Sequence, residues 1–205
     1  MSMLFLKNVT KRFEEKLLFR ELNEVFPQKG LFLILGGSGT GKTTLLRIIA
    51  GLDTAYDGTI EGGGVDAVSF AFQEHRLFPS LSALWNVSEI LRAEGMPRNK
   101  AEATAREALL SVGFPEGDLR TRPAALSGGM RQRVSLARAF AAERPILLLD
   151  EPEKGLDEAL RERLYARIRE EADRRLVLVV THTPERLLPV ADGALTIGEE
   201  KRIPS

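Results

Sequence analysis

The hydrophobic and polar positions of the chain fall into two kinds of segment. Short, wholly apolar runs occur at 31–35, 146–149 and 176–180, and such runs are typical of parallel strands that are covered on both faces. Between them lie longer segments whose apolar residues recur at helical spacing. Strands that alternate with helices in this way predict an α/β fold with a mostly parallel sheet.

Weaker patterns predict the remaining elements and the division of the chain. We expect further strands at 3–9, 22–26, 68–72 and 194–197, a short β segment between 57 and 64, and helices from 42 to a stop at Gly51 and at 81–94, 99–112, 126–142 and 158–172. From about 76 to 126 the pattern is helical only. We therefore predict one domain over residues 1–205, with a helical lobe at about 76–126 inserted into a core of about 1–75 and 127–205.

A glycine-rich stretch follows the first apolar run and leads into a helix. Its spacing, Gly36-x-x-x-x-Gly41-Lys42-Thr43, fits the phosphate-binding loop of nucleoside triphosphatases. Glycines let several backbone N–H groups point inward, the lysine reaches the β- and γ-phosphates, and the threonine hydroxyl can bind Mg²⁺. An ordinary glycine-rich turn would need neither the lysine nor the hydroxyl. The residues predicted to contact nucleotide are Gly36, Gly37, Ser38, Gly39, Thr40, Gly41, Lys42, Thr43 and Thr44.

Polar side chains follow three of the predicted strands, at the edge where ligands of open α/β sheets bind. Asp150 and Glu151 end the strand at 146–149 and point in opposite directions, so that Asp150 can face Mg²⁺ while Glu151 faces an attacking water. His182 follows the strand at 176–180, where it can contact the γ-phosphate. Gln73 follows the strand at 68–72 and by itself is weak evidence for function.

A second anion site without a lysine is predicted at Ser127, Gly128 and Gly129. Ser127 is a suitable N-cap, and the two glycines leave the backbone N–H groups of the helix start accessible. One nucleotide does not need two such sites in the same chain. The second site can therefore complete the nucleotide pocket of another copy, although a capped helix without further function remains the alternative.

The charge balance and the residue types exclude several classes of protein. The chain has 29 Lys and Arg against 29 Asp and Glu, whereas bulk nucleic-acid binders carry a basic excess. Cysteine is absent, so disulfides, thiolate metal sites and a cysteine nucleophile are excluded. The first residues lack the apolar core of a signal peptide, and no run reaches the roughly 18 apolar residues of a membrane span. We expect a cytoplasmic protein whose membrane association is peripheral.

The stretch Leu126-Ser127-Gly128-Gly129-Met130-Arg131-Gln132-Arg133 resembles the signature motif of ATP-binding cassette (ABC) proteins. The other motifs of that family occur in its order. The phosphate loop and Gln73 come first, Ile146–Glu151 resembles the Walker B strand with its catalytic glutamate, 153–157 resembles the D-loop, and His182 matches the switch histidine. Phe13 lies where the family places an aromatic ring against adenine. The resemblance covers essentially the whole chain.

The resemblance implies a fold, cofactors and partners. It implies a P-loop NTPase (RecA-like) core with an antiparallel β patch and a helical lobe, ATP as nucleotide, and Mg²⁺ held by Thr43, Gln73 and Asp150. It also implies a head-to-tail dimer, formed with a second copy or a paralogue, with two ATP molecules at its interface. The D-loop has Lys154-Gly155 where Ser-Ala is more usual, and Gly37 replaces a frequent proline.

Within the family, 72–87, 126–140 and 180–193 resemble ATPase subunits of bacterial importers, with the nitrate, sulfonate and taurine type as the nearest kind. The membrane subunit would be a separate integral membrane permease docking near 76–84, where Leu77, Phe78, Leu81 and Leu84 supply either an apolar groove or lobe core. The alternatives are a soluble ABC ATPase acting on ribosomes or DNA, a P-loop kinase and a non-catalytic nucleotide-binding regulator. The neutral charge argues against the ATPase acting on ribosomes or DNA, and we expect no nucleic-acid partner. The signature motif argues against the kinase. The set of Gln73, Glu151 and His182 argues against the non-catalytic regulator.

Overall fold

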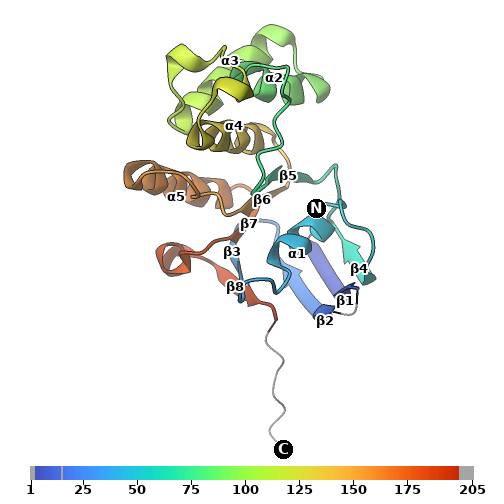
Figure 1. Ribbon diagram of the computed structural model, residues 1–205. Coiled ribbons are helices and arrows are strands. Elements are labelled where there is room, and N and C mark those ends of the chain that lie inside the picture. The colour runs from blue at the N-terminus through green and yellow to red at the C-terminus, as the bar shows by residue number, and fades with distance from the viewer. Residues whose placement is uncertain (1–2, 15, 199–205) are drawn as a thin grey trace, which may run out of the picture.

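The computed structural model describes residues 3–14 and 16–198, and its strands form two sheets (Figure 1). The parallel sheet has the order β5-β6-β7-β3-β8 and consists of β3 (Gly30–Leu35), β5 (Val68–Ala71), β6 (Ile146–Asp150), β7 (Leu176–Val180) and β8 (Gly193–Thr196). The antiparallel sheet has the order β2-β1-β4 and consists of β1 (Leu4–Phe13), β2 (Lys16–Phe26) and β4 (Asp57–Glu61). The predicted parallel sheet and antiparallel patch are both confirmed.

The helices follow the predicted order. They are α1 (Lys42–Ile49), α2 (Ala83–Ala93), α3 (Arg98–Ser111), α4 (Gly128–Ala141) and α5 (Glu158–Ala172), with short 3₁₀ turns at Glu116–Asp118, Pro123–Ala125, Pro184–Arg186 and Leu188–Val190. Side-chain caps explain several of the boundaries. Ser82 accepts a hydrogen bond from the Trp85 N–H at the start of α2, and Asp157 accepts one from the Leu160 N–H at the start of α5.

The parallel sheet is covered on both faces, as its apolar strands require. Successive residues of β6 point to opposite faces, so Leu148 packs in the same core cluster as α1, whereas Leu147 and Leu149 pack in the cluster that contains residues of α5. The α1 cluster also contains Leu4 and Phe26 of the antiparallel sheet. Helix α1 is therefore buried between the two sheets (Figure 1).

A third core cluster belongs to the helical lobe, which lies above the sheet in Figure 1. Val87 and Leu91 of α2 pack there with Leu109 of α3 and Val134 of α4. Helix α4 also contributes Phe140 to the core beneath the lobe. Because α4 packs with both parts, it connects the lobe to the sheet.

The first two strands are longer than the sequence pattern predicts. β1 continues to Phe13, and β2 begins at Lys16 rather than near Leu22. The pattern is obscured because Lys11 of β1 is buried, with 5% of its surface exposed. Its ammonium is paired with Asp53 at 2.9 Å and donates to the Ala55 carbonyl at 2.6 Å. A buried, paired lysine appears polar in the sequence, although it occupies an inward position.

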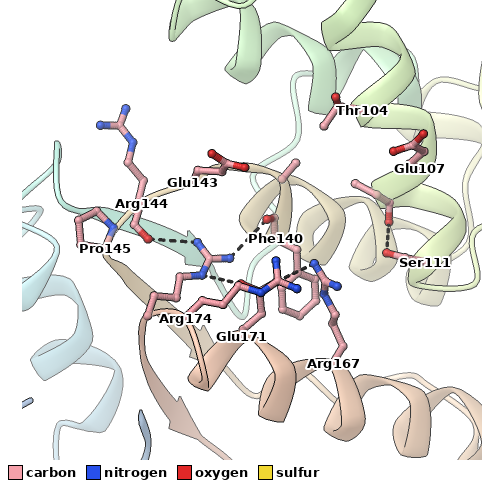
Figure 2. A pocket seen from close by; sticks show the side chains of 13 residues that line it. Thr104, Glu107, Ser111, Phe140, Glu143, Arg144, Pro145, Arg167, Glu171 and Arg174 are labelled. Atoms are coloured by element: carbon pink, nitrogen blue, oxygen red, sulfur yellow. Dashed lines mark hydrogen bonds and ion pairs between the residues drawn. The ribbon is translucent and has the colours of Figure 1, made fainter. Parts of the chain in front are cut away.

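A cavity of about 660 Å³ separates α3 from α5, and Figure 2 shows the charged residues that line it. Beside it, the buried Arg175 guanidinium binds Glu171 Oε2 at 2.7 Å and the Ala142 carbonyl at 2.7 Å. Arg167 binds the other oxygen of Glu171 at 2.6 Å. These contacts attach the start of β7 to the end of α4 and to α5. Among the described residues, no helix combines the length and apolarity that a membrane crossing requires.

Candidate functional site

The loop between β3 and α1 has the conformation of an anion cradle. Gly36, Gly39 and Gly41 have φ values of 147°, 72° and 99°, which side chains other than glycine rarely adopt. A Cβ at Gly36 would lie 2.4 Å from the Ile197 carbonyl oxygen, so a larger residue is also excluded there by contact. The loop ends at the N-terminus of α1, where unpaired N–H groups carry partial positive charge.

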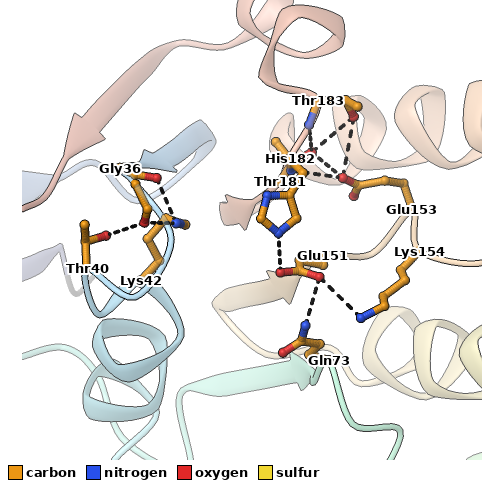
Figure 3. A network of polar contacts seen from close by, with 11 residues as sticks. Gly36, Thr40, Lys42, Gln73, Glu151, Glu153, Lys154, Thr181, His182 and Thr183 are labelled. Carbon is orange, nitrogen blue, oxygen red and sulfur yellow. Dashed lines mark hydrogen bonds and ion pairs between the residues drawn. The ribbon is translucent and has the colours of Figure 1, made fainter.

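The ammonium of Lys42 lies against the loop itself. Its Nζ donates hydrogen bonds to the carbonyls of Gly36 and Gly37, both at 2.8 Å (Figure 3). The Thr40 hydroxyl donates to the same Gly37 carbonyl at 2.9 Å. No acidic side chain of the described residues lies within ion-pair distance of Lys42. Its charge is therefore available to an anion in the loop.

Three of the predicted polar residues form a hydrogen-bonded cluster around Glu151. His182 Nε2 lies 2.6 Å from Glu151 Oε1, and Gln73 Nε2 donates to Glu151 Oε2 at 2.9 Å (Figure 3). The cluster forms because β5, β6 and β7 are adjacent parallel strands whose carboxyl ends meet at one edge. Glu151 itself has a φ of 50°, a left-handed conformation that costs energy for a residue with a side chain.

Asp150 is the last residue of β6, directly before Glu151, and is 1% exposed. Neither of its carboxylate oxygens has a hydrogen-bond partner. Burial raises the pKa of Asp150 and the Glu151 charge adds to the increase, whereas Thr43, Lys42 and His182 oppose it. Buried, unpartnered carboxylate oxygens beside a threonine hydroxyl are suited to Mg²⁺, which uses one or two protein carboxylates and takes its other ligands from phosphates and water.

The loop and the cluster line the same cavity, which has a volume of about 320 Å³. Lys42, Thr43 and Thr44 line it on the side of α1, and Gln73, Glu151 and His182 line it on the side of the strand ends. The cavity thus combines a cationic anion cradle with a carboxylate, an imidazole and an amide.

Residues 19–154 match the protein family described as "ABC transporter". The chain belongs to this family. It is 41% identical over 202 residues to the Fe(3+) ions import ATP-binding protein FbpC 1 of Rhizobium meliloti, covering 93% of this chain and 57% of the relative. It is 41% identical over 203 residues to the sulfate/thiosulfate import ATP-binding protein CysA of Ralstonia nicotianae, covering 92% and 55%. The chain spans little more than half the length of these relatives.

Two solved structures have the same fold as this ABC cassette. The dimeric structure of MJ0796, a bacterial ABC transporter cassette, has a TM-score of 0.85 at 30% identity and covers 98% of this chain and 97% of that one. A post-hydrolysis state of the same cassette bound to ADP and Pi has a TM-score of 0.84 at 29% identity and covers 99% and 100%. The P-loop NTPase fold expected from the resemblance is therefore confirmed.

The signature residues of the cassette do not line the cavity of their own chain. Ser127 caps α4 by accepting a hydrogen bond from the Met130 N–H at 3.2 Å. Gly129 lies against the D-loop, where an added Cβ would be 2.8 Å from the Gly155 carbonyl oxygen. Phe13, at the end of β1, is also outside the cavity lining and is 66% exposed. Of the residues predicted from the sequence, the fold brings those of the phosphate loop and the strand ends together in one cavity. It leaves Phe13 and the signature residues at 127–129 outside that cavity.

Two further residues lie at the cluster or line the cavity, and their positions there were not predicted. Lys154 Nζ lies 3.8 Å from Glu151 Oε2, so the carboxylate has a cationic neighbour. The turn hydrogen bond from the Lys154 N–H to the Glu151 carbonyl explains this approach, and the spacing of three residues is a signal from which it could be predicted. Leu18 of β2 also lines the cavity, but nothing in its sequence context distinguishes it from other apolar strand residues.

Proposed function

We propose that this chain binds ATP with Mg²⁺ and hydrolyses it, and that hydrolysis drives import through a separate membrane subunit. The observation that carries the proposal is the carboxylate of Glu151, bound to His182 and Gln73, in one cavity with Lys42 of the phosphate loop. The matched relatives named for the import of Fe(3+) ions and sulfate/thiosulfate support the direction of transport.

In this proposal, the phosphate loop holds the triphosphate. The backbone N–H groups of 36–41, the N-terminus of α1 and the Lys42 ammonium receive the phosphate oxygens. Lys42 would exchange its two carbonyl partners for charged oxygens, which form stronger hydrogen bonds. The exposed ring of Phe13 would stack on adenine.

Thr43, Asp150 and Gln73 would hold Mg²⁺. When bound, the ion neutralises charge on the β- and γ-phosphates. The orphaned oxygens of Asp150 support this assignment. Gln73 would bind the ion through its amide oxygen, because its hydrogen bond to Glu151 uses the amide nitrogen and leaves that oxygen available.

Glu151 would then act as the general base. A water oxygen attacks the γ-phosphorus, the bond to the β,γ-bridging oxygen breaks, and ADP leaves. Glu151 accepts a proton from the water, while Lys42 and His182 stabilise the charge that develops on the γ-phosphoryl group. Positioning and electrostatics supply most of the rate.

A second copy, or a paralogue, would complete the site. Ser127, Gly128 and Gly129 are outside the cavity of their own chain but present the N-terminus of α4. In a head-to-tail dimer they would close on the γ-phosphate of the other chain. The dimeric arrangement of the similar cassette supports this view.

The membrane subunit would dock on the side of the molecule where lobe and sheet meet. An apolar groove of about 290 Å³ lies there, and its rim includes Leu52 and Val65, which are 44% and 63% exposed. None of the residues predicted to dock the membrane subunit near 76–84 lines this groove: Leu77 and Leu84 pack against the lobe core, whereas Phe78 is 44% exposed. A partner there would place the chain at the cytoplasmic face of the membrane.

Product analysis and co-purification test the proposal. With ATP and Mg²⁺, the chain should release ADP and inorganic phosphate, and a phosphorylated small molecule would favour a kinase instead. Tagged protein from detergent-solubilised membranes of its source should retain an integral membrane polypeptide in stoichiometric amount. Ribosomal or DNA-bound proteins in its place would contradict the transport part and leave the hydrolysis part intact.

A further inference from the structure

A second carboxylate lies behind the Glu151 cluster. Glu153, in the turn after β6, is buried with 7% of its surface exposed. Its Oε1 accepts hydrogen bonds from the Thr181 hydroxyl, from the His182 N–H at 3.3 Å and from the Thr183 hydroxyl at 3.5 Å (Figure 3). All of these donors belong to the turn that carries the His182 imidazole.

A carboxylate in this position is costly. The other oxygen, Oε2, is buried without a hydrogen-bond partner. No basic side chain among the described residues is within ion-pair distance of Glu153, and its donors are neutral. An apolar side chain would avoid this desolvation cost. Unlike an apolar side chain, the carboxylate links the turn after β6 to the turn at 181–183 through hydrogen bonds.

The turn that carries Glu153 is itself held from the other side. Gln132 of α4, which is 2% exposed, donates from Nε2 to the Pro152 carbonyl at 3.0 Å. On the His182 side, Tyr165 of α5 lies within hydrogen-bond distance of the Thr183 hydroxyl, at 3.2 Å. Glu153 is thus the link between two anchored segments.

We propose that Glu153 is a positioning residue for His182. It fixes the turn at 181–183 so that the imidazole Nε2 meets Glu151 and is directed at the cavity. The inference rests on the proposed function for what the aligned pair does, but the alignment itself does not depend on nucleotide. Because displacements of about 1 Å from a productive geometry cost up to about 100-fold in rate, such a link would contribute to turnover without touching substrate.

Two variants of Glu153 separate the effect of its hydrogen bonds from the effect of its side-chain volume. Glu153→Gln keeps an oxygen acceptor for the donors, and Glu153→Leu removes it while filling a similar volume. We expect Glu153→Gln to retain kcat within about threefold and Glu153→Leu to lower kcat by about 10- to 100-fold, with the KM for ATP changed by less than about threefold. Glu185→Leu, an exposed change on the same segment, is the matched control and should leave kcat at the wild-type value.

Histidine NMR tests the alignment directly, because the chain has only two histidines, His75 and His182. The imidazole Cε1–Hε1 signals can be assigned with His75→Gln. In the nucleotide-free protein, Glu153→Leu should move the His182 signal, while Glu153→Gln and Glu185→Leu should leave it in place. If Glu153→Leu does not fold, Thr181→Val removes a donor from the other side and should produce the same displacement.

The results separate this inference from the function on which it rests. An unchanged His182 signal in Glu153→Leu, or in Thr181→Val if that variant replaces it, would overturn the positioning role even if the wild type hydrolyses ATP. A displaced signal with unchanged kcat would overturn its contribution to turnover. Absence of hydrolysis by the wild type would contradict the proposed function, whereas the NMR signals would still decide whether Glu153 holds His182.

Discussion

His182 Nε2 and Glu151 Oε1 are 2.6 Å apart, although the two residues are 31 positions apart in the chain. This contact joins the ends of β6 and β7 at the cavity edge. The contact fixes the direction of the Glu151 carboxylate. The backbone of Glu151 is in the left-handed region, with a φ of 50°. A base and an imidazole fixed in this way beside a phosphate loop form the centre of the proposed site.

Lys42→Ala should abolish the stabilisation of the protein by ATP. The ammonium is the only unpaired cation among the described loop residues 36–44, and its loss removes the main attraction for the triphosphate. At about 100 times its dissociation constant, ATP should raise the wild-type melting temperature by roughly 5–10 °C. Differential scanning fluorimetry with and without ATP checks this. An equal shift in the variant would mean that the nucleotide binds elsewhere.

Asp150→Asn should stabilise the nucleotide-free protein. Burial raises the pKa of Asp150 in the folded state, so the folded protein loses stability as pH rises through that pKa. At pH 7 the folded protein therefore bears the cost of a buried charge. Removing that charge should add about 1 kcal/mol, or roughly 2–4 °C in melting temperature. The gain should shrink as pH falls towards the usual carboxyl range. A lower melting temperature at pH 7 would contradict the account, and Mg²⁺-dependent hydrolysis should be lost in either case.

Arg175→Met should destabilise the fold through the buried arginine cluster. The change leaves Glu171 with only the Arg167 partner and leaves the Ala142 carbonyl without its donor. Breaking a buried pair of this kind costs about 3 kcal/mol or more. Arg186→Met, which removes exposed pairs with Glu158 and Glu162, is the control and should cost less than about 1 kcal/mol. Urea unfolding distinguishes them, and equal midpoints would show that the buried pair is not needed.

Glu151→Gln should accumulate as an ATP-dependent dimer, because ATP would bind without being turned over. Gly128→Glu in the same background should prevent the dimer. A Cβ at Gly128 meets nothing within 4 Å, so the monomer has room for it, while its charge would oppose the γ-phosphate of the other chain. Light scattering at saturating ATP measures the mass. If Glu151→Gln alone stays monomeric, or if the double variant with Gly128→Glu still dimerises, the shared site is contradicted.

Much of this arrangement follows from local pattern. The helix at 158–172 and the strand at 176–180 were predicted with the bounds that the structure has, because their patterns and caps are clear. The strand-end position of Glu151 and His182 follows from parallel topology alone. The length of β1 was not predictable, since the burial of Lys11 depends on Asp53, 42 residues away. The contacts of Glu153 likewise depend on residues about 28 positions later.

The sequence also left the apolar residues near 76–84 undecided between lobe core and docking groove. The structure divides them, because Leu77 packs inward while Phe78 is exposed. The two residues precede α2, and Asn86 of that helix fixes the turn in which they lie. The side chain of Asn86 is buried and binds both backbone groups of Phe78, which fixes the preceding turn. A single asparagine in the sequence gives no sign of this.

The most direct measurement is the rate of phosphate release from ATP by the wild type and by Glu151→Gln, with ATP binding measured in parallel. If Glu151 is the base, the variant should lose about 100- to 10,000-fold in kcat, with ATP affinity changed by less than about threefold. Glu162→Gln, an exposed change on α5, should hydrolyse ATP at the wild-type rate. A Glu151→Gln protein that releases phosphate as fast as the wild type would contradict the assignment of this cluster as the hydrolytic centre.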